Sequence, residues 1–545
     1  MLLLTTAGLG GAASRRGPGR SIRGLFSSMS RYYSSPSVPS SKSIRFVKPL
    51  DPETIPKGFA AAYTHAGIKA AISPKPVPEV VSSVSSAATS AAATLGLGPK
   101  AAPPKPDLAL IVSTSSEPAA AAGTFTRNVF KAAPVVLSSQ ILAGGADRDG
   151  ARARAILINS GCANAVTGQR GLDDARRCDA EVAAALDRPT EKTLLLSTGV
   201  IGVPLPMDAI SPRLRELAQR VQETDGKSAS TPEVWHETSR AFMTTDTFPK
   251  LRSRVFKLGN KEYRMLGIDK GAGMIHPSMG GINAGSNGSL HATLLGFIAT
   301  DAPIAPPALQ QALEHAVERS FNCISVDGDM STNDTILALA NGPRSEEIGT
   351  DSPDFAVFQR ELTTFCIDLA QLIVRDGEGA EKFVEINVKS APSYGVAHAI
   401  ASSISTSALV KCALHGGDAN WGRILCAVGY AKLPLTDPAA GAAQKGQWSI
   451  DPAKVTVRFL PPPSAPTDAS FAPLTVLKDG VPQAVDEAEA GRLLALEDIV
   501  IEVDLQGGSW TDGGESAVAR DSHEATYWTC DFSKEYVAIN GDYRS

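Results

Sequence analysis

The spacing of apolar residues predicts that the chain mixes buried strands with amphipathic helices. Strands are expected where short apolar runs end in loops of glycine, asparagine and serine, or where apolar and polar residues alternate. These segments are 153–158, 193–196, 384–388 and 499–505. Helices are expected at 306–321 and 355–373, where apolar side chains recur at helical spacing. This mixture indicates an α/β or α+β protein.

Loops and one low-complexity segment separate these elements. Proline and glycine mark surface connections at 461–466 and 507–515. Alanine, serine and proline dominate the segment 73–106. Such a segment buries too little apolar surface to offset the conformational entropy lost on folding, so we expect a solvated surface insertion there.

Composition excludes several classes of protein. The 545 residues exceed one small module and fit about two to four domains. No run of 18 apolar residues occurs, which argues against a membrane-spanning helix, and a formal charge of −5 argues against a dedicated nucleic-acid-binding protein. The seven cysteines form no CxxC pair, and no HExxH, Walker or GxSxG motif is present. We therefore expect no disulfide framework, no metal site and no cofactor.

Charge is distributed unevenly at the amino terminus. Residues 1–50 contain no aspartate or glutamate, and the five arginines of residues 1–33 stand among serines, alanines and glycines. This composition is typical of a mitochondrial transit peptide, and RYYS at 31–34 resembles a site cut by matrix processing peptidases. We expect residues 1–33 to be removed, which takes the formal charge from −5 to −10, and the mature protein to lie in the mitochondrial matrix. A disordered basic tail is the alternative.

The strongest signal is a pair of motifs in the middle of the chain. KGAGMIHPSM occupies 270–279, and ATLLGFIATDA occupies 292–302. Apart from the residues between them, these motifs resemble the sequence KGxGMIxPxMATxLxFxxTDA of the ornithine acetyltransferases, also called bifunctional glutamate N-acetyltransferases of arginine biosynthesis.

Further motifs carry the same resemblance from about residue 107 onward, in the order in which the family has them. They are FTRN at 125–128, NSGCANA at 159–165, STGVIG at 197–202, MTTDT at 243–247, SVDGDMSTND at 325–334, DGEGA at 376–380, NWGRI at 420–424 and INGDYRS at 539–545.

The resemblance implies a self-cleaving α/β sandwich that resembles the N-terminal-nucleophile enzymes. Members of the family cut themselves at the position of Ala292 and Thr293. The cut would give an α chain of 34–292 and a β chain of 293–545, which would interleave in one fold and pair as an α2β2 heterotetramer. Thr293 would then carry a free α-amino group beside its hydroxyl, and this pairing activates a nucleophile without a histidine.

The resemblance also assigns the residues of the site. Thr198 and Gly199 would form the oxyanion hole, where glycine lets the backbone approach closely. Lys270 would pair with a substrate carboxylate, and Glu378 with an ammonium group of ornithine. The other expected substrate contacts are Thr244 (with Thr245 as the alternative), Thr293 itself, Asn540 and Ser545, which replaces a more usual threonine.

The twelve residues 280–291 are a departure from the family pattern. Their four glycines predict a flexible loop, which either lengthens the self-cleavage loop or reflects a retained intron. Closing a longer loop costs little additional entropy. The sequence from Ala292 continues the family pattern, so Thr293 remains the expected nucleophile.

The expected activity is acyl transfer by a ping-pong mechanism. Thr293 would take the acetyl group from N2-acetyl-L-ornithine, release ornithine and pass the acetyl group to L-glutamate. Bifunctional members of the family also accept acetyl-CoA as the donor, and no nucleotide-binding motif separates the two cases. The alternatives are an N-terminal-threonine amidohydrolase or aminopeptidase of the same fold, and a processed binding scaffold without activity.

Overall fold

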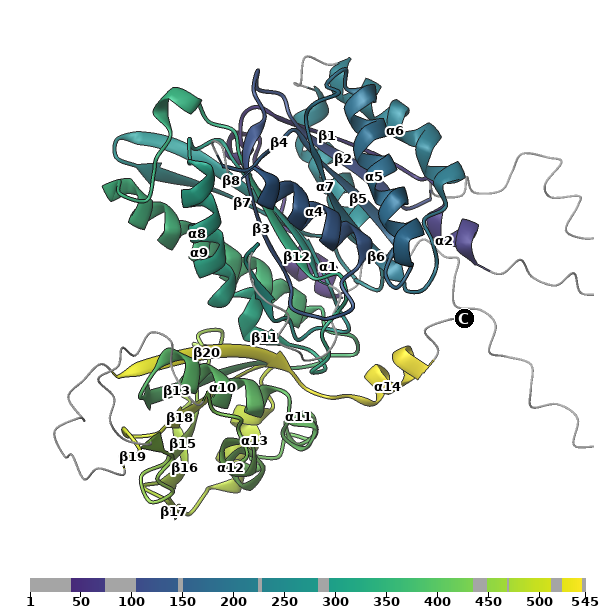
Figure 1. The fold of residues 1–545 in the computed structure, drawn as a ribbon. Helices are drawn as coiled ribbons and strands as arrows, with labels where there is room; N and C mark the ends of the chain where they lie inside the picture. The colour runs from purple at the N-terminus through teal and green to yellow at the C-terminus, as the bar shows by residue number, and fades with distance from the viewer. Residues whose placement is uncertain are drawn as a thin grey trace, which may run out of the picture. The chain divides into compact units, whose positions relative to one another are not determined.

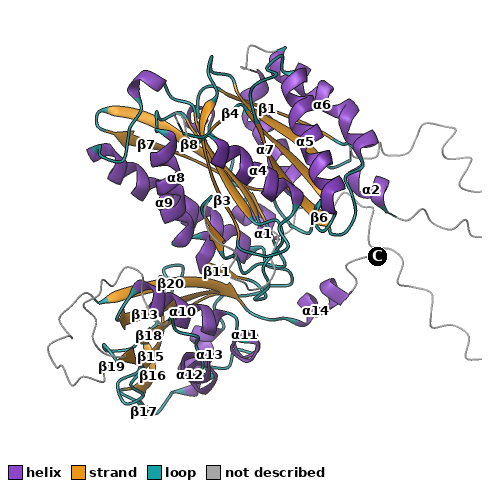
Figure 2. Cartoon of the chain, viewed as in Figure 1, coloured by secondary structure: helices purple, strands orange, loops and turns teal. Residues whose placement is uncertain are grey.

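Two stacked β-sheets and a third, mainly carboxyl-terminal sheet organise this computed structural model (Figures 1 and 2). The structure describes residues 41–73, 104–145, 150–223, 228–282, 294–434, 448–467, 470–510 and 522–541. Residues 39–545 belong to one compact unit. The predicted transit peptide at 1–33, residues 74–103 of the predicted insertion, and residues 283–293 around the predicted cut lie outside the described residues.

Sheet 1 has the strand order β1-β2-β5-β6, with β5 and β6 parallel and the other neighbours antiparallel. Its strands are β1 (Phe59–Thr64), β2 (Leu108–Ser113), β5 (Ala155–Cys162) and β6 (Thr193–Val200). Helices α5 (Gly168–Ala185) and α6 (Met207–Gln222) cover one face and form a buried apolar cluster with it. Because both faces of this sheet are buried, its strands are almost continuously apolar.

Sheet 2 has the order β4-β3-β12-β10-β8-β7, and β9 pairs with β3 beside this path. Its strands are β3 (Ala119–Thr126), β4 (Arg152–Ala153), β7 (Lys250–Leu258), β8 (Lys261–Lys270), β9 (Met279–Gly280), β10 (Leu295–Thr300) and β12 (Thr335–Ala340). Helices α8 (Pro306–Glu318) and α9 (Pro353–Arg375) pack on its outer face. The adjacent strands β12 and β10, which follow the predicted cut, lie between β3 and β8, which precede it, so segments from both sides of the predicted cut share this sheet.

The two stacked sheets bury a shared apolar layer between them. One cluster joins Ile156 of sheet 1 to Phe297 and Leu337 of sheet 2. Helix α7 (Pro232–Phe242) adds Trp235, which is fully buried and stacks on Phe297 with ring centroids 6.5 Å apart. The order helix, sheet, sheet, helix confirms the predicted α/β sandwich.

Sheet 3 has the order β11-β20-β13-β18-β15-β16-β17. Its strands are β11 (Ile324–Ser325), β13 (Phe383–Ala391), β15 (Thr456–Leu460), β16 (Leu474–Lys478), β17 (Val481–Pro482), β18 (Asp498–Asp504) and β20 (His523–Cys530). The helices of this region are α10 (Tyr394–Ser405), α11 (Ala408–His415), α12 (Trp421–Gly429), α13 (Glu487–Leu494) and α14 (Lys534–Gly541). Apolar residues of sheet 3 and of α8 and α9 belong to one buried cluster, so sheets 2 and 3 share a core.

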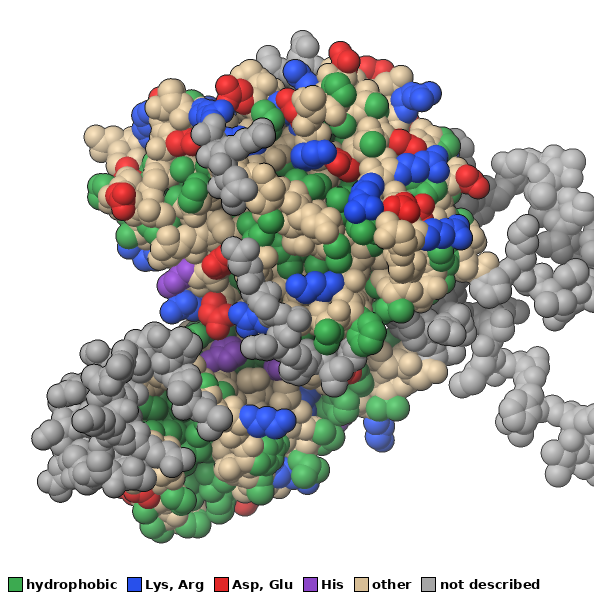
Figure 3. All heavy atoms as spheres, in the orientation of Figure 1, with side chains coloured by type: hydrophobic (Ala, Val, Ile, Leu, Met, Phe, Trp, Pro, Cys, Tyr) green, Lys and Arg blue, Asp and Glu red, His purple; other side chains and the backbone are tan. Residues whose placement is uncertain are grey.

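Short elements complete the described chain. They are α1 (Ser41–Phe46), α2 (Ile68–Ile72), α4 (Ala133–Gly144), the strand pair β14 (Trp448–Ser449) and β19 (Ser509–Trp510), and the 3-10 turns η1 (Pro52–Thr54), η2 (Ser228–Ser230), η3 (Phe321–Cys323) and η4 (Arg344–Glu346). No single described helix is long and apolar enough to cross a membrane, and only α10 and α11 taken together, with 59° between them, reach that length and composition. Acidic and basic side chains intermix over α5 and α6 (Figure 3), and ion pairs such as Arg177–Glu181 join successive turns there.

The periodicity predicted the long elements correctly. The expected strands at 153–158, 193–196, 384–388 and 499–505 are β5, β6, β13 and β18, and the expected helices at 306–321 and 355–373 are α8 and α9. Helix α8 ends at Glu318, and the tighter turn η3 follows. The connection expected at 461–466 is a loop.

Two loop predictions need correction. Ser509–Trp510, expected in a surface connection, forms β19 and pairs with β14, while residues 511–515 lie outside the described residues. Gly280, expected to begin a flexible loop, ends β9 and pairs with Phe125 of β3. The reason is that the side-chain amide of Asn322 clamps the preceding residue, Met279, by accepting from its N–H at 2.9 Å and donating to its carbonyl at 3.0 Å.

Replacing Trp235 by alanine tests the layer between the sheets. We expect Trp235→Ala to lower the free energy of unfolding by about 3–5 kcal/mol, because the substitution leaves a cavity in a closed apolar layer. Urea denaturation followed by circular dichroism measures this loss. Tyr430→Ala, at a residue that is 61% exposed, is the control and should change stability by about 0.5 kcal/mol or less. Equal effects of the two substitutions would contradict the packing described here.

Candidate functional site

The predicted oxyanion residues Thr198 and Gly199 lie at the end of β6, beside the end of the parallel strand β5. Gly199 pairs with Gly161 and has φ = +126°. A Cβ atom at Gly199 would lie 2.3 Å from the carbonyl carbon of Gly161, so no side chain fits there. Thr198 is buried at 1% exposure. The two strand ends are therefore held in contact, with backbone groups close together.

Buried asparagines fix this pair of strand ends. The Ser197 hydroxyl donates to Asn159 Oδ1 at 2.5 Å. From the segment before β12, Asn333 Nδ2 donates to the carbonyls of Ala163 and Ser197, both at 2.8 Å. Neither Asn159 nor Asn333 was among the predicted site residues, although both lie in motifs that carry the family resemblance. Asn159 directly follows the apolar run 155–158, a signal that could have revealed it, whereas Asn333 lies in a mainly polar motif.

Lys270, the last residue of β8, comes to the same place. It is buried at 2% exposure, and its Nζ lies 3.4 Å from the Thr198 hydroxyl. Burial lowers the pKa of Lys270, and the nearby carboxylate of Asp246 opposes this shift. The structure therefore joins two predicted site residues, Lys270 and Thr198, that are 72 positions apart in sequence.

Lys250, a fully buried lysine, helps to position the segment at Thr244 and the backbone just after Lys270. Lys250 Nζ donates to Asp246 at 2.6 Å and to Asp376 at 2.7 Å, and all three side chains are inaccessible. Asp246 in turn accepts from the N–H of Gly271 at 2.8 Å and from the N–H of Thr244 at 2.9 Å. This ion cluster therefore fixes the backbone after Lys270 and the backbone of the predicted substrate residue Thr244.

The charges of this cluster stabilise one another. Although burial acts to raise the pKa of Asp246, Lys250 and Lys270 hold that pKa below its ordinary value. Burial also acts to lower the pKa of Lys250, but the two carboxylates raise it above its ordinary value. The pKa of Asp376 is raised by burial, with Lys250 opposing the shift. The two carboxylates offset the burial of Lys250 because both contact it directly, since charges in a low-dielectric interior require close partners.

The threonine alternatives occupy different environments. Thr244 is half-buried and its N–H is held by Asp246, whereas Thr245 is exposed. The segment before them is held by Lys105, whose Nζ donates to the carbonyls of Met243 and Arg240. Burial lowers the pKa of Lys105 to about 8, and Asp246 opposes the shift. Lys105, at the end of the low-complexity segment 73–106, was not among the predicted site residues.

Glu378 and Asn540 contact each other directly. Asn540 Nδ2, on α14, donates to Glu378 Oε2 at 2.7 Å. The N–H of Glu378 donates to the carbonyl of Ala272 at 2.8 Å, two residues after Lys270. A Cβ atom at Gly273 would lie 2.2 Å from the Glu378 carboxylate, so glycine is required beside it. The structure thus brings Lys270, Glu378 and Asn540 to one region.

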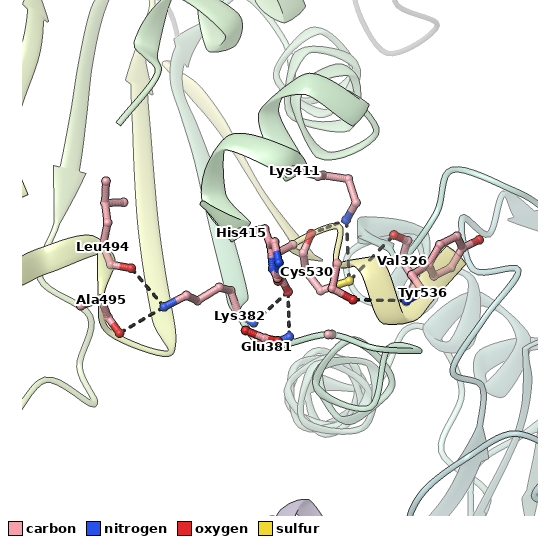
Figure 4. Close-up of polar contacts among 12 residues, drawn as sticks. Val326, Glu381, Lys382, Lys411, His415, Leu494, Ala495, Cys530 and Tyr536 are labelled. Atoms are coloured by element: carbon pink, nitrogen blue, oxygen red, sulfur yellow. Dashed lines mark hydrogen bonds and ion pairs between the residues drawn. The ribbon is translucent and has the colours of Figure 1, made fainter. Parts of the chain in front are cut away.

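The turn that follows Glu378 is anchored to the end of β20. Asp531 accepts from the N–H groups of Glu381 and Lys382, both at 2.8 Å, and lies 2.7 Å from His415 Nδ1. Lys411, also buried, donates to the Thr529 hydroxyl at 2.9 Å and to the carbonyl of Cys530. Figure 4 shows Lys411 pointing at Cys530, and His415 next to the backbone of Glu381 and Lys382.

Glu381, His415 and Asp531 are also the one group of described residues with the spacing of metal ligands, their atoms lying within 4.8 Å of one another. The Asp531 oxygens already accept from two peptide N–H groups and contact the imidazole. This donor set is therefore satisfied as a structural anchor for the Glu378 turn.

The predicted nucleophile Thr293, its neighbour Ala292 and the terminal Ser545 lie outside the described residues. The first residue described after the gap, Leu294, is fully buried, and its N–H donates to Asp334 Oδ1 at 2.6 Å. The next residue, Leu295, pairs with Lys270 across β10 and β8. The chain therefore enters sheet 2 beside Lys270.

Comparisons with known proteins agree with the resemblance seen in the motifs. A family model described as the ArgJ family matches residues 90–545. The chain is 53% identical over 525 residues to the mitochondrial arginine biosynthesis bifunctional protein ArgJ of Malassezia globosa, an alignment covering 91% of this chain and 95% of that protein. The protein of the same name from Coprinopsis cinerea is 47% identical over 527 residues, 95% of this chain and 98% of the relative. The crystal structure of the arginine biosynthesis bifunctional protein ArgJ from Bacillus halodurans is 33% identical, covers 44% of this chain and 95% of its own, and has a TM-score of 0.35.

Removing the buried lysine tests the ion cluster. We expect Lys250→Met to lower the free energy of unfolding at pH 7 by about 3–5 kcal/mol, because two buried carboxylates lose their counter-charge. Lys261→Met is the control, since the Lys261–Glu346 pair is mostly exposed and contributes about 1 kcal/mol or less.

The pH dependence of this loss has a defined sign. In the unsubstituted protein the depressed pKa of Asp246 gives stability that is present above the unfolded value, about 3.9, and is lost as pH falls. In Lys250→Met the pKa of Asp246 should rise and that of Asp376 should rise further, because Lys250 opposes both shifts. Ionising these buried carboxyl groups then destabilises the variant increasingly as pH rises. Urea denaturation from pH 4 to 7 should show the difference between the two proteins widening with pH. A constant difference would contradict the proposed charge pairing.

Proposed function

Since this chain belongs to the ArgJ family, we propose that it transfers the acetyl group of N2-acetyl-L-ornithine to L-glutamate in arginine biosynthesis, and that it also forms N-acetylglutamate from acetyl-CoA. Its relatives from Malassezia globosa and Coprinopsis cinerea are named arginine biosynthesis bifunctional proteins, and the alignments span almost their whole lengths. The pairing of Leu295 with Lys270 connects this proposal to a site. It brings the chain just after the predicted nucleophile next to a residue of the family motifs.

Thr293 is the nucleophile in this proposal. The precursor cuts itself between Ala292 and Thr293, and the new α-amino group of Thr293 accepts the proton of its own hydroxyl. The hydroxyl oxygen attacks the acetyl carbonyl of N2-acetylornithine, ornithine leaves, and glutamate accepts the acetyl group from the threonine ester. A free α-amino group, with a pKa of roughly 8, is a suitable base for such a step near neutral pH.

Thr198 and Gly199 stabilise the negative charge that develops on the carbonyl oxygen. The close contact of Gly199 with Gly161 exposes backbone groups that no side chain obstructs. Donors that are fixed before the reaction stabilise an oxyanion without reorganisation. Lys270, 3.4 Å from the Thr198 hydroxyl, adds a cation beside them for a substrate carboxylate.

Glu378, with Asn540 hydrogen-bonded to it, binds the side-chain ammonium of ornithine. Thr244, whose backbone is held by Asp246, and Ser545 contribute further polar contacts. The ion cluster of Lys250 keeps the Thr244 and Lys270 segments in register with each other. The chemistry needs neither a metal nor a cofactor.

The mature enzyme is mitochondrial, as the names of the relatives support, and we place it in the matrix after removal of residues 1–33. Its α chain, 34–292, and β chain, 293–545, pair as an α2β2 heterotetramer. The interleaved strands of sheet 2 support continued association of the two chains after the cut.

Substituting the nucleophile tests the proposal. The unsubstituted protein should yield two chains on denaturing electrophoresis, with amino termini at Ser34 and Thr293 by mass spectrometry, whereas Thr293→Ala should stay uncut and inactive. Ser289→Ala removes a hydroxyl four positions earlier in the sequence and should still be cut. Retained transferase activity in Thr293→Ala would refute the assignment, and ornithine release that is independent of glutamate would identify a hydrolase instead.

Removing the charge of Glu378 tests the substrate contact. Glu378→Gln keeps an acceptor for Asn540 but loses the charge that pairs with an ammonium group. We expect the KM for N2-acetylornithine to rise roughly 10- to 100-fold, the usual effect of losing one charge-assisted hydrogen bond, with a smaller change in kcat. Steady-state assays measure both constants, and the exposed Glu487→Gln is the control. An unchanged KM would exclude this role for Glu378.

A further inference from the structure

Polar contacts hold the last described helix, α14, against the rest of the protein. None of its described residues is buried. Asn540 Nδ2 donates to Glu378 Oε2 at 2.7 Å, and the Tyr536 hydroxyl donates to Asp327 Oδ2 at 3.1 Å. A Cβ atom at Gly379 would lie 2.6 Å from the backbone nitrogen of Tyr536, so the turn that carries Glu378 packs directly on this helix.

Asp327 also holds a loop that packs on Glu378. Its carboxylate accepts from the N–H of Met274 at 2.6 Å and from the N–H of Ile275 at 2.9 Å. Met274 has φ = +57°, a conformation that residues with side chains rarely adopt, and these two hydrogen bonds fix it. Gly273, in the same loop, lies against the Glu378 carboxylate. Asp327 therefore joins α14 to the loop on Glu378.

The backbone carbonyl of Tyr536 orients the side-chain amide of Asn540. Asn540 Nδ2 donates to this carbonyl at 3.0 Å and to Glu378 Oε2 at 2.7 Å, so both of its hydrogens are used. If the amide were turned over, its oxygen would face two acceptors and neither hydrogen bond would form. Oδ1 is therefore the atom that Asn540 can offer to a ligand.

The acceptors at this place suit a cation. Among the described residues, neither Glu378 Oε1 nor Asn540 Oδ1 has a hydrogen-bond partner. Burial, together with the nearby carboxylates of Asp327, Glu378 and Asp329, raises the pKa of Tyr536, so its hydroxyl keeps its proton and donates. Acceptor atoms beside several carboxylates favour an ammonium group over an anion.

We propose that Tyr536 is a positioning residue for the ammonium group of ornithine. Its hydroxyl, through Asp327, ties α14 to the loop on Glu378, and its carbonyl leaves Asn540 Oδ1, together with Glu378, to accept from the ammonium. The proposal rests on the proposed function, in which Glu378 and Asn540 bind this group. It adds the residue that fixes their geometry and thereby sets the preference for a side chain that ends in an ammonium.

The test compares two substrates of the processed enzyme. Tyr536→Phe removes the hydroxyl and keeps the ring and the carbonyl. We expect the KM for N2-acetylornithine to rise roughly 10-fold, with kcat changed less than about twofold, because a hydrogen bond to a charged group is lost and the acceptors are less well ordered. N2-acetylnorvaline has the same carbon chain without the ammonium, so its kcat/KM should change little. The preference between the two substrates, measured as the ratio of their kcat/KM values in steady-state assays, should therefore fall by a similar factor.

A second substitution tests the route through Asp327. Asp327→Ala removes the acceptor of the Tyr536 hydroxyl and should show the same selective loss, and adding Tyr536→Phe to it should change the KM no further. Tyr430→Phe, at a tyrosine that is 61% exposed, is the control and should leave the KM and the preference unchanged. Thermal unfolding of each variant reports whether it folds.

The proposal is overturned if Tyr536→Phe keeps the KM and the preference of the unsubstituted enzyme, or if both substrates lose activity equally, as a general loss of structure would cause. An additive effect of the two substitutions would exclude the route through Asp327. These outcomes leave the proposed function intact, whereas an unsubstituted enzyme that releases no ornithine from N2-acetylornithine would refute the proposed function itself.

Discussion

The site depends on the charged side chain of Lys250, which is fully inaccessible to solvent. Lys250 lies between Asp246 and Asp376, and each of its two carboxylate partners belongs to a different segment that approaches the site. Asp246 fixes the backbone at Thr244 and Gly271, and Asp376 begins the DGEGA turn that carries Glu378. Burying such ions is favourable only when their geometry is nearly ideal, so the cluster admits very few arrangements of these segments. Its contribution is chiefly to specify geometry.

Around this cluster, the ends of several strands of the sandwich lie in one region. The ends of β5 and β6 supply Gly161, Thr198 and Gly199, while the end of β8 supplies Lys270. The turn between α9 and β13 reaches the same region through Glu378, and α14 does so through Asn540. Rigid strands position the groups at the reacting carbonyl, and the turns and the terminal helix supply the polar contacts, which is a common division of labour in enzymes.

Sequence analysis predicted the elements whose periodicity is strong and missed those whose composition misleads. Helix α9 was correctly predicted because apolar residues mark one face over its whole length. Strands β1 and β3 are rich in alanine, a residue that favours helices, and they are strands because both of their faces are buried between layers.

The residues of the site were likewise only partly predictable from the sequence. The motifs led to Thr198, Lys270, Glu378 and Asn540, and the structure brings these together. Lys250 carried no signal, since an isolated lysine beside a strand ordinarily faces solvent, and only the fold reveals its two carboxylate partners. Asp334 stood inside a quoted motif, but its contact with Leu294 depends on β10 entering beside β12.

The strand order of sheet 2 has a consequence for the processed molecule that we propose. β10 and β12 are flanked on both sides by strands that precede the proposed cut, so the two proposed chains would be joined along two rows of strand–strand hydrogen bonds. An uncut precursor folds in a unimolecular reaction, with the effective concentration of a tethered partner. Once cut and then unfolded, the same residues must meet as separate molecules at ordinary concentrations. The proposed processing would therefore replace a reversible folding equilibrium by a lifetime that the rate of unfolding sets.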